Sequence, residues 1–116
     1  MIGWLFILRF LLFWPMVDQL LAALPFVEGF PNLLRWLADN DFEVIVISDA
    51  NTYFINHILE THGLDNCVTK VFSNPAYFDE NGLLRIEWYH SQDYCDLSNK
   101  NMCKGWWGLW MLSLLL

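Results

Sequence analysis

The feature that most constrains this chain is a run of β-branched residues, Val44-Ile45-Val46-Ile47, in the middle of the sequence. Such side chains favour extended backbone, and a run that is apolar on both faces is typical of a strand buried on both sides, as in parallel sheets. The polar sequence Ser48-Asp49-Ala50-Asn51 follows, and its side chains can cap a helix start. With a helix over 52–62 and a second strand over 68–72, the pattern predicts a strand-helix-strand unit, whose crossover is nearly always right-handed.

The flanking sequence predicts further elements of an α/β fold. Apolar positions at helical spacing predict helices over 18–23 and 31–39, the second beginning at Pro31, which a first helical turn tolerates. Two short apolar runs, 76–78 and 83–88, are separated by a turn that contains Asn81-Gly82, and this predicts a β-hairpin. The remaining segment, 89–105, reads as a loop that leads to a helix start near Cys103.

Length and charge limit the classes of function. A chain of 116 residues has room for one domain, and a hydrophobic content of 56% is enough to build its core. With 13 acidic and 6 basic residues the net charge is −7, so there is no basic surface to hold nucleic acid. Three cysteines form no disulfide framework of the secreted kind, which favours a reducing, cytoplasmic setting.

Both ends of the chain are unusually apolar. Residues 1–17 carry a single charge, Arg9, and residues 106–116 carry none. A bilayer span needs about 20 apolar residues, and a central arginine is costly, so a membrane anchor is an alternative that we do not favour. We expect three parts, a hydrophobic helical segment over 1–23, a domain over 24–105 and a hydrophobic tail over 106–116, with self-association through the ends as an option.

The best candidate for a ligand-binding residue is Ser48. Ligands of open α/β sheets bind beyond the carboxyl ends of the strands, and Ser48 directly follows the first predicted strand. A hydroxyl beside the N-terminus of a helix, where the dipole favours an anion, can hold a phosphate. The same residues can also be a simple helix cap, and the local sequence leaves both readings open.

From about Leu24 to Gly105 the chain resembles the phosphoethanolamine/phosphocholine phosphatase and pyridoxal-phosphate phosphatase family of the haloacid dehalogenase superfamily. The order and spacing of several short motifs carry the resemblance. The matching residues are Leu24-Pro25-Phe26 with Gly29, Ile47-Ser48-Asp49-Ala50-Asn51, Ser73-Asn74-Pro75, Gly82-Leu83, Tyr89-His90 and Asn101-Met102-Cys103-Lys104-Gly105.

The resemblance implies a partial Rossmann-like core and the hydrolysis of small phosphomonoesters through an aspartyl-phosphate intermediate, with Mg²⁺ as cofactor. In this reading Ser48 hydrogen-bonds the transferring phosphoryl group, and Lys104 neutralises charge on the intermediate. Asp49 and Asn51 would line the entrance to the site. A separate hypothesis rests on charge alone: a carboxylate at Asp49 would favour substrates with a cationic head group.

The chain also departs from the family pattern. An Asp-x-Asp pair after the first core strand should supply the nucleophile and the general acid and base, and a later acidic loop should help to hold Mg²⁺. The sequence contains neither, because its one Asp-x-Asp, Asp39-Asn40-Asp41, precedes the strand that Ser48 follows. We therefore expect an inactive fragment, with a non-catalytic phosphate-binding or interaction module, possibly membrane-associated, as the alternative.

Other polar and aromatic residues carry weaker hypotheses. His90, Cys95 and Cys103 match no common zinc spacing, and Ser98 stands where the family pattern has a further cysteine. We expect His57 to be packed or solvated rather than a proton shuttle. The tryptophans Trp106, Trp107 and Trp110 are explained most simply as buried tail residues.

Overall fold

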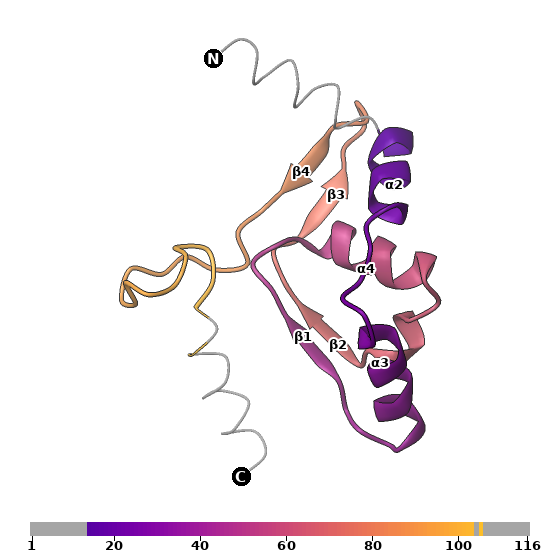
Figure 1. Ribbon diagram of the computed structural model, residues 1–116. Helices are drawn as coiled ribbons and strands as arrows, with labels where there is room; N and C mark the ends of the chain where they lie inside the picture. The colour runs from indigo at the N-terminus through magenta and orange to yellow at the C-terminus, as the bar shows by residue number, and fades with distance from the viewer. Residues whose placement is uncertain (1–13, 104, 106–116) are drawn as a thin grey trace.

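The computed structural model describes residues 14–103 and Gly105 (Figure 1). Within these residues the chain forms α-helices, one short 3₁₀-helix and two small sheets. In chain order the elements are α2 (Trp14–Ala22), α3 (Phe30–Asp39), β1 (Ile45–Ile47), α4 (Thr52–Thr61), the 3₁₀-helix η1 (Asp65–Cys67), β2 (Lys70–Phe72), β3 (Ala76–Phe78) and β4 (Leu84–Ile86). The predicted α/β character is confirmed at this level, as a mixed fold of helices and small sheets.

The predicted strand-helix-strand unit is present. Strands β1 and β2 pair in parallel, with Val46 opposite Val71, and α4 connects them. The structure begins β2 at Lys70, two residues later than the sequence predicts, because Val68 is the C-cap of η1 and Thr69 lies in a bend. The parallel pair places the carboxyl ends of both strands at one edge.

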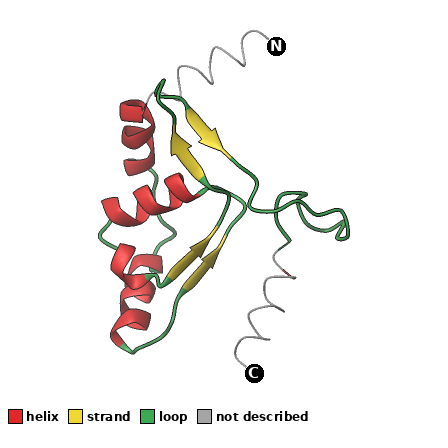
Figure 2. Ribbon diagram, turned by 180° about the vertical axis from the view of Figure 1, so that it is seen from behind, coloured by secondary structure: helices red, strands yellow, loops and turns green. Residues whose placement is uncertain are grey.

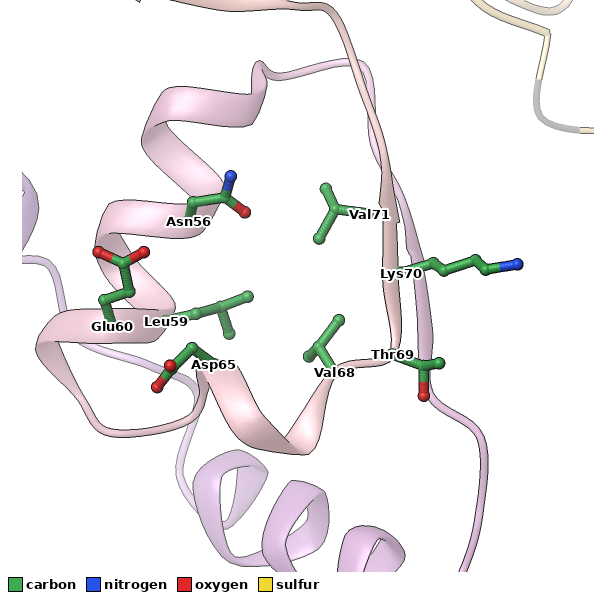
Figure 3. Close-up of a pocket in the computed structure, with 8 residues that line it drawn as sticks. All are labelled: Asn56, Leu59, Glu60, Asp65, Val68, Thr69, Lys70 and Val71. Atoms are coloured by element: carbon green, nitrogen blue, oxygen red, sulfur yellow. The ribbon is translucent and has the colours of Figure 1, made fainter.

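The helices lie on one side of the two sheets (Figure 2). Figure 3 shows Val68 and Val71 pointing toward Leu59 of α4, whereas Lys70 points to the opposite face. The buried core lies on the helix side and contains Leu34, Leu59 and Leu64. Since no described helix covers the other face, the residues of β1 are only half-buried, which differs from the strand buried on both sides that the apolar run indicates.

The helix boundaries follow local chemistry. Helix α3 begins after Gly29, whose φ of 80° lies in the left-handed region, and it carries Pro31 in its first turn. It ends at Asp39 with Asn40 as its C-cap, and the turn continues through Asp41, which has a positive φ of 61°. This Asp39-Asn40-Asp41 turn precedes β1 and therefore lies at the opposite end of that strand from Ser48.

The predicted hairpin is confirmed. Strands β3 and β4 pair antiparallel with Phe78 opposite Leu84, and Gly82 turns the chain with φ 74°. The Asp79 carboxylate accepts the N–H groups of Asn81 and Leu83, both at 2.9 Å, and contacts Arg85 Nε at 2.8 Å. The bond from the Leu83 backbone, followed by Arg85, lowers the pKa of Asp79.

Helix α2 is tied to α4 by polar contacts. The Tyr53 hydroxyl donates to Asp18 Oδ1 at 2.5 Å, and His57 Nδ1 lies 3.6 Å from the same oxygen. His57 also stacks on Tyr53, with ring centroids 5.9 Å apart. His57 is therefore a packing residue at this helix interface, as the sequence predicts.

The two apolar ends, residues 1–13 and 106–116, lie outside the described part of the chain, and so do Lys104 and the tail tryptophans. No helix within 14–103 combines the length and the apolar character that crossing a membrane requires. The three-part division at residues 23 and 105 stays a prediction.

We predict that Leu64→Ala destabilises the fold by about 2–5 kcal/mol, since it removes a fully buried side chain and leaves a cavity. Urea denaturation followed by circular dichroism measures the change. Leu97→Ala is the matched control, because Leu97 is 100% exposed and should change stability by no more than about 0.5 kcal/mol. Equal effects of the two changes would contradict the assignment of this core.

A second prediction concerns alkaline stability. Burial, followed by the hydrogen bond to Asp18, raises the pKa of Tyr53 to about 12. A phenol whose pKa is higher in the folded state contributes stability below its unfolded value of about 10, and loses that contribution as pH rises through about 12. Unfolding free energies measured from pH 9 to 12 should therefore fall less steeply in Tyr53→Phe than in the wild type, and identical slopes would refute the contact.

Candidate functional site

The candidate site lies at the carboxyl edge of the parallel strands. Ser48 directly follows β1, and its N–H donates to Phe72 O at 3.0 Å, so the ladder continues one residue past the strand. Ser73 directly follows β2 and is 1% exposed; its hydroxyl has no hydrogen-bond partner among the described residues. The structure thus places two hydroxyl-bearing residues at adjacent strand ends, one of which the sequence analysis had singled out.

The connection from β1 to α4 is a tight polar turn. The Ala50 N–H donates to Ser48 Oγ at 3.2 Å, and the half-buried Ser48 is therefore held close to the start of the helix. Asn51 is the N-cap of α4, with its Oδ1 accepting the Phe54 N–H at 2.9 Å. The predicted capping role is confirmed for Asn51, which is 3% exposed; its contact with a substrate stays a prediction.

At the N-terminus of α4, two of the backbone N–H groups that could bind an anion are already hydrogen-bonded within the protein. The N–H of Thr52 donates to Asn74 O at 2.9 Å, and that of Phe54 is taken by the cap. An anion here would therefore be stabilised by the positive end of the helix dipole and by the Ser48 hydroxyl, rather than by a full set of unused backbone N–H groups.

A buried amide, Asn74, organises this edge. Its Nδ2 donates to the carbonyls of Asp49 and Ala50, both at 2.9 Å, and its Oδ1 accepts the Tyr89 N–H at 3.0 Å. The side chain thus joins the turn after β1 to the segment after β4. Sequence reasoning noticed Asn74 only within a family motif; an asparagine directly after a predicted strand was the available signal.

Asp49 is exposed and meets a distant part of the chain. Its Oδ2 accepts a hydrogen bond from Asn99 Nδ2, fifty positions further along. A cavity of about 130 Å³ lies here, lined by Asp49, Leu97, Ser98, Asn99 and Met102. The sequence predicts Asp49 at the site but gives no sign of its contact with Asn99, because nothing local connects the two residues.

Residues 89–103 fold back on themselves beside this edge. The His90 N–H donates to Asn101 O, and the Cys103 N–H donates to His90 Nε2 at 3.3 Å. The predicted phosphate-neutralising residue, Lys104, lies outside the described residues, next to the buried Cys103. Cys95 Sγ lies 3.4 Å from Ser98 Oγ, so this thiol contacts a hydroxyl.

The described residues do not form a metal centre. No group of three His, Cys, Asp or Glu side chains within 14–103 is arranged to hold an ion. Asp49 is an acidic side chain at the carboxyl edge, and the one Asp-x-Asp of the chain lies at the other end of β1. The residues present therefore do not fit a Mg²⁺ site by themselves, and no catalytic step can be derived through one.

A separate cavity of about 340 Å³ lies between α4 and β2 (Figure 3). Its lining includes Val68, Thr69 and Lys70, which stand at the amino end of β2. It is therefore at the opposite end of the strand from Ser48 and Ser73. This cavity is therefore not part of the candidate site at the carboxyl edge.

A parallel strand-helix-strand unit with a serine and an aspartate after its first strand is an α/β arrangement, and ligands of such sheets bind beyond the carboxyl ends of the strands. The chain belongs to a phosphatase family, since residues 15–107 match the family model described as "Putative Phosphatase".

Named relatives agree with this membership. The human protein named pyridoxal phosphate phosphatase PHOSPHO2 is 40% identical over 90 residues, covering 76% of this chain and 37% of the relative. An Arabidopsis thaliana protein named thiamine phosphate phosphatase-like protein is 45% identical over 93 residues, covering 77% and 38%. The Gallus gallus phosphoethanolamine/phosphocholine phosphatase is 39% identical over 83 residues, covering 70% and 31%.

The matched part of this chain spans less than two fifths of the length of each of these relatives. No solved structure matches the chain. The comparisons thus establish the family.

We predict that Asn74→Ala destabilises the fold by about 2–4 kcal/mol, because it leaves two carbonyls and one N–H without their buried partner. Amide hydrogen exchange should also accelerate at residues 48–52. Asn66→Ala, at an exposed position in η1, is the matched control and should leave both measurements near wild type. Unchanged exchange at 48–52 in Asn74→Ala would show that the amide does not organise the turn.

Proposed function

We propose that this chain is part of a phosphatase of the haloacid dehalogenase type that hydrolyses small phosphomonoesters. Phosphoethanolamine, phosphocholine and pyridoxal phosphate are the candidate substrates. The observation that carries the proposal is the position of Ser48, at the carboxyl end of β1 and before α4, in a chain that belongs to a phosphatase family. The named relatives are phosphatases, which favours this proposal over a non-catalytic interaction module.

In the proposed site Ser48 Oγ hydrogen-bonds an oxygen of the phosphoryl group. The dipole of α4 and the charge of Lys104 stabilise the negative charge of that group. Asp49 faces the leaving group, and Asn51 supports the site by capping α4 while lying near its entrance. The domain that carries these residues is proposed to span 24–105.

The proposed reaction has two steps. An aspartate attacks phosphorus, the bond to the leaving oxygen breaks, and a general acid protonates the alcohol; water then hydrolyses the aspartyl phosphate and releases inorganic phosphate. The amino-acid chain has no Asp-x-Asp pair at the carboxyl edge to supply these two groups, since its one such pair, Asp39-Asn40-Asp41, lies at the other end of β1. We therefore expect the chain alone to bind phosphate without turning over a substrate.

Membership of the family fits a metal-dependent mechanism, and we propose Mg²⁺ as the ion. When bound, such an ion offsets negative charge on the phosphoryl oxygens. The described residues contain no cluster that could hold it, so we assign it no ligands here.

We predict that the full chain binds inorganic phosphate and that Ser48→Ala weakens this binding by about tenfold, equivalent to about 1.4 kcal/mol. A titration followed by ¹H–¹⁵N NMR measures the affinity, with the largest shifts expected at residues 48–53. Ser91→Ala, a serine exposed in the loop after β4, serves as the control and should bind phosphate normally.

Phosphate release from an aryl phosphate in the presence of Mg²⁺ tests the expected inactivity. Turnover that Ser48→Ala abolishes would overturn the expectation of inactivity while supporting the phosphatase assignment. Failure of the wild-type chain to bind phosphate would count against the proposed site itself.

A further inference from the structure

Two serine side chains are neighbours at the carboxyl edge, one after each strand of the parallel pair. Ile47 lies opposite Phe72 in the ladder, and the bond from the Ser48 N–H to Phe72 O carries the same register one residue further. The register partner of Ser48 is therefore Ser73. Neighbouring strands lie about 4.8 Å apart, and register partners of a parallel pair have their side chains on the same face.

The face that the two serines share is the one that α4 covers. Figure 3 shows Val71 pointing toward α4, and side chains alternate along a strand, so Ser73, two positions later, lies on the same side. Ser73 is 1% exposed, and its Oγ is closed to solvent and has no hydrogen-bond partner among the described residues. Burying a hydroxyl without a partner destabilises a fold, so this side chain needs an explanation.

The backbone around Ser73 is fixed, whereas its hydroxyl is not. Phe72 O accepts the Ser48 N–H at 3.0 Å, and Asn74 O accepts the Thr52 N–H at 2.9 Å. Neither bond involves Ser73 Oγ, so rotation among the three staggered rotamers of this side chain breaks no hydrogen bond with the described residues. The hydroxyl can therefore turn while both strand ends stay in place.

The Ser48 hydroxyl can accept one more hydrogen bond than it does. A serine hydroxyl has one proton to donate and two lone pairs with which to accept. Ser48 Oγ accepts the Ala50 N–H at 3.2 Å, which uses one lone pair. When the Ser48 proton is donated to a phosphoryl oxygen, the second lone pair is available to Ser73. A hydroxyl that accepts a hydrogen bond becomes a better donor, because successive bonds polarise one another.

We propose that Ser73 is a positioning residue that donates its hydroxyl proton to Ser48 Oγ when phosphate is bound. Ser48 donates in turn to an oxygen of the phosphate, so that each hydroxyl proton has an acceptor and the Ser48 side chain is held in its binding orientation. Ser73 does not touch the ligand itself, since its Oγ is closed to solvent. The inference rests on the proposed function, because it assumes that Ser48 binds the phosphoryl group.

The test compares Ser73→Ala with the wild type in the full chain, with inorganic phosphate as the ligand and NMR titration as the measurement. We expect the affinity to fall about threefold, less than the roughly tenfold loss for Ser48→Ala, because Ser73 acts only through Ser48. The midpoint of urea unfolding should stay the same or rise, since the buried hydroxyl has no bond to lose. A serine with a purely structural role would give the opposite pair of results, a lower midpoint and an unchanged affinity.

Further variants separate the hydroxyl from the volume of the side chain. Ser73→Cys keeps a side chain of similar shape but replaces the hydroxyl with a weak donor, so it should lower the phosphate affinity as Ser73→Ala does. Adding Ser73→Ala to Ser48→Ala should cause no further loss, because both residues act through one contact. Ser91→Ala, at an exposed serine, is the control and should keep both the affinity and the midpoint.

Three outcomes would overturn the inference while leaving the phosphate site at Ser48 intact. Wild-type affinity in both Ser73→Ala and Ser73→Cys would show that the hydroxyl does not support the ligand. A clearly lower unfolding midpoint in Ser73→Ala would show that the hydroxyl already has a structural partner. Additive losses in the double variant would exclude action through Ser48. Failure of the wild-type chain to bind phosphate would instead remove the proposed function and this inference together.

Discussion

The arrangement of the carboxyl edge depends on one buried side chain, the amide of Asn74. The turn after β1 and the segment after β4 each have backbone groups that bond to this amide, and the start of α4 bonds to the backbone carbonyl of the same residue. Buried peptide N–H and C=O groups need hydrogen-bond partners. In a turn that leaves a strand, the neighbouring strand no longer provides these partners. Asn74 supplies both donors and acceptors from a position at the end of β2, so the two strand ends and the later loop share one support.

This support explains how a short parallel pair can present a site. Strands of three residues have little ladder of their own, and the helices cover only one face of the pair. The core around Leu34, Leu59 and Leu64 holds that face, while side-chain hydrogen bonds hold the edge. Apolar burial packs α4 against the sheet, and the polar contacts orient the turn that carries Ser48 and Asp49.

Predictions from the sequence succeeded where the signal was local. Pro31 near a helix start, Asn51 as a cap and Asn81-Gly82 in a turn each act through neighbouring residues, and each appears as expected. The β-branched run forms the predicted strand, although it is only half-buried. The start of β2 was placed too early, because the turn of 3₁₀-helix over Asp65–Cys67 has no strong periodic signal. The contacts of Asn74 were missed, since a single polar residue does not reveal which distant carbonyls it will meet.

By itself, the sequence determined the order of elements, the position of Ser48 after a strand and the resemblance to a phosphatase family, because these depend on local propensity and on short motifs. Only the tertiary structure decided that Asn99 meets Asp49, that Ser73 is buried beside Ser48 and that Asp18 ties α2 to α4. The physical reason is that hydrogen bonds between distant segments depend on the relative placement of whole elements. That placement comes from the packing of the core and is not encoded in any one stretch of residues.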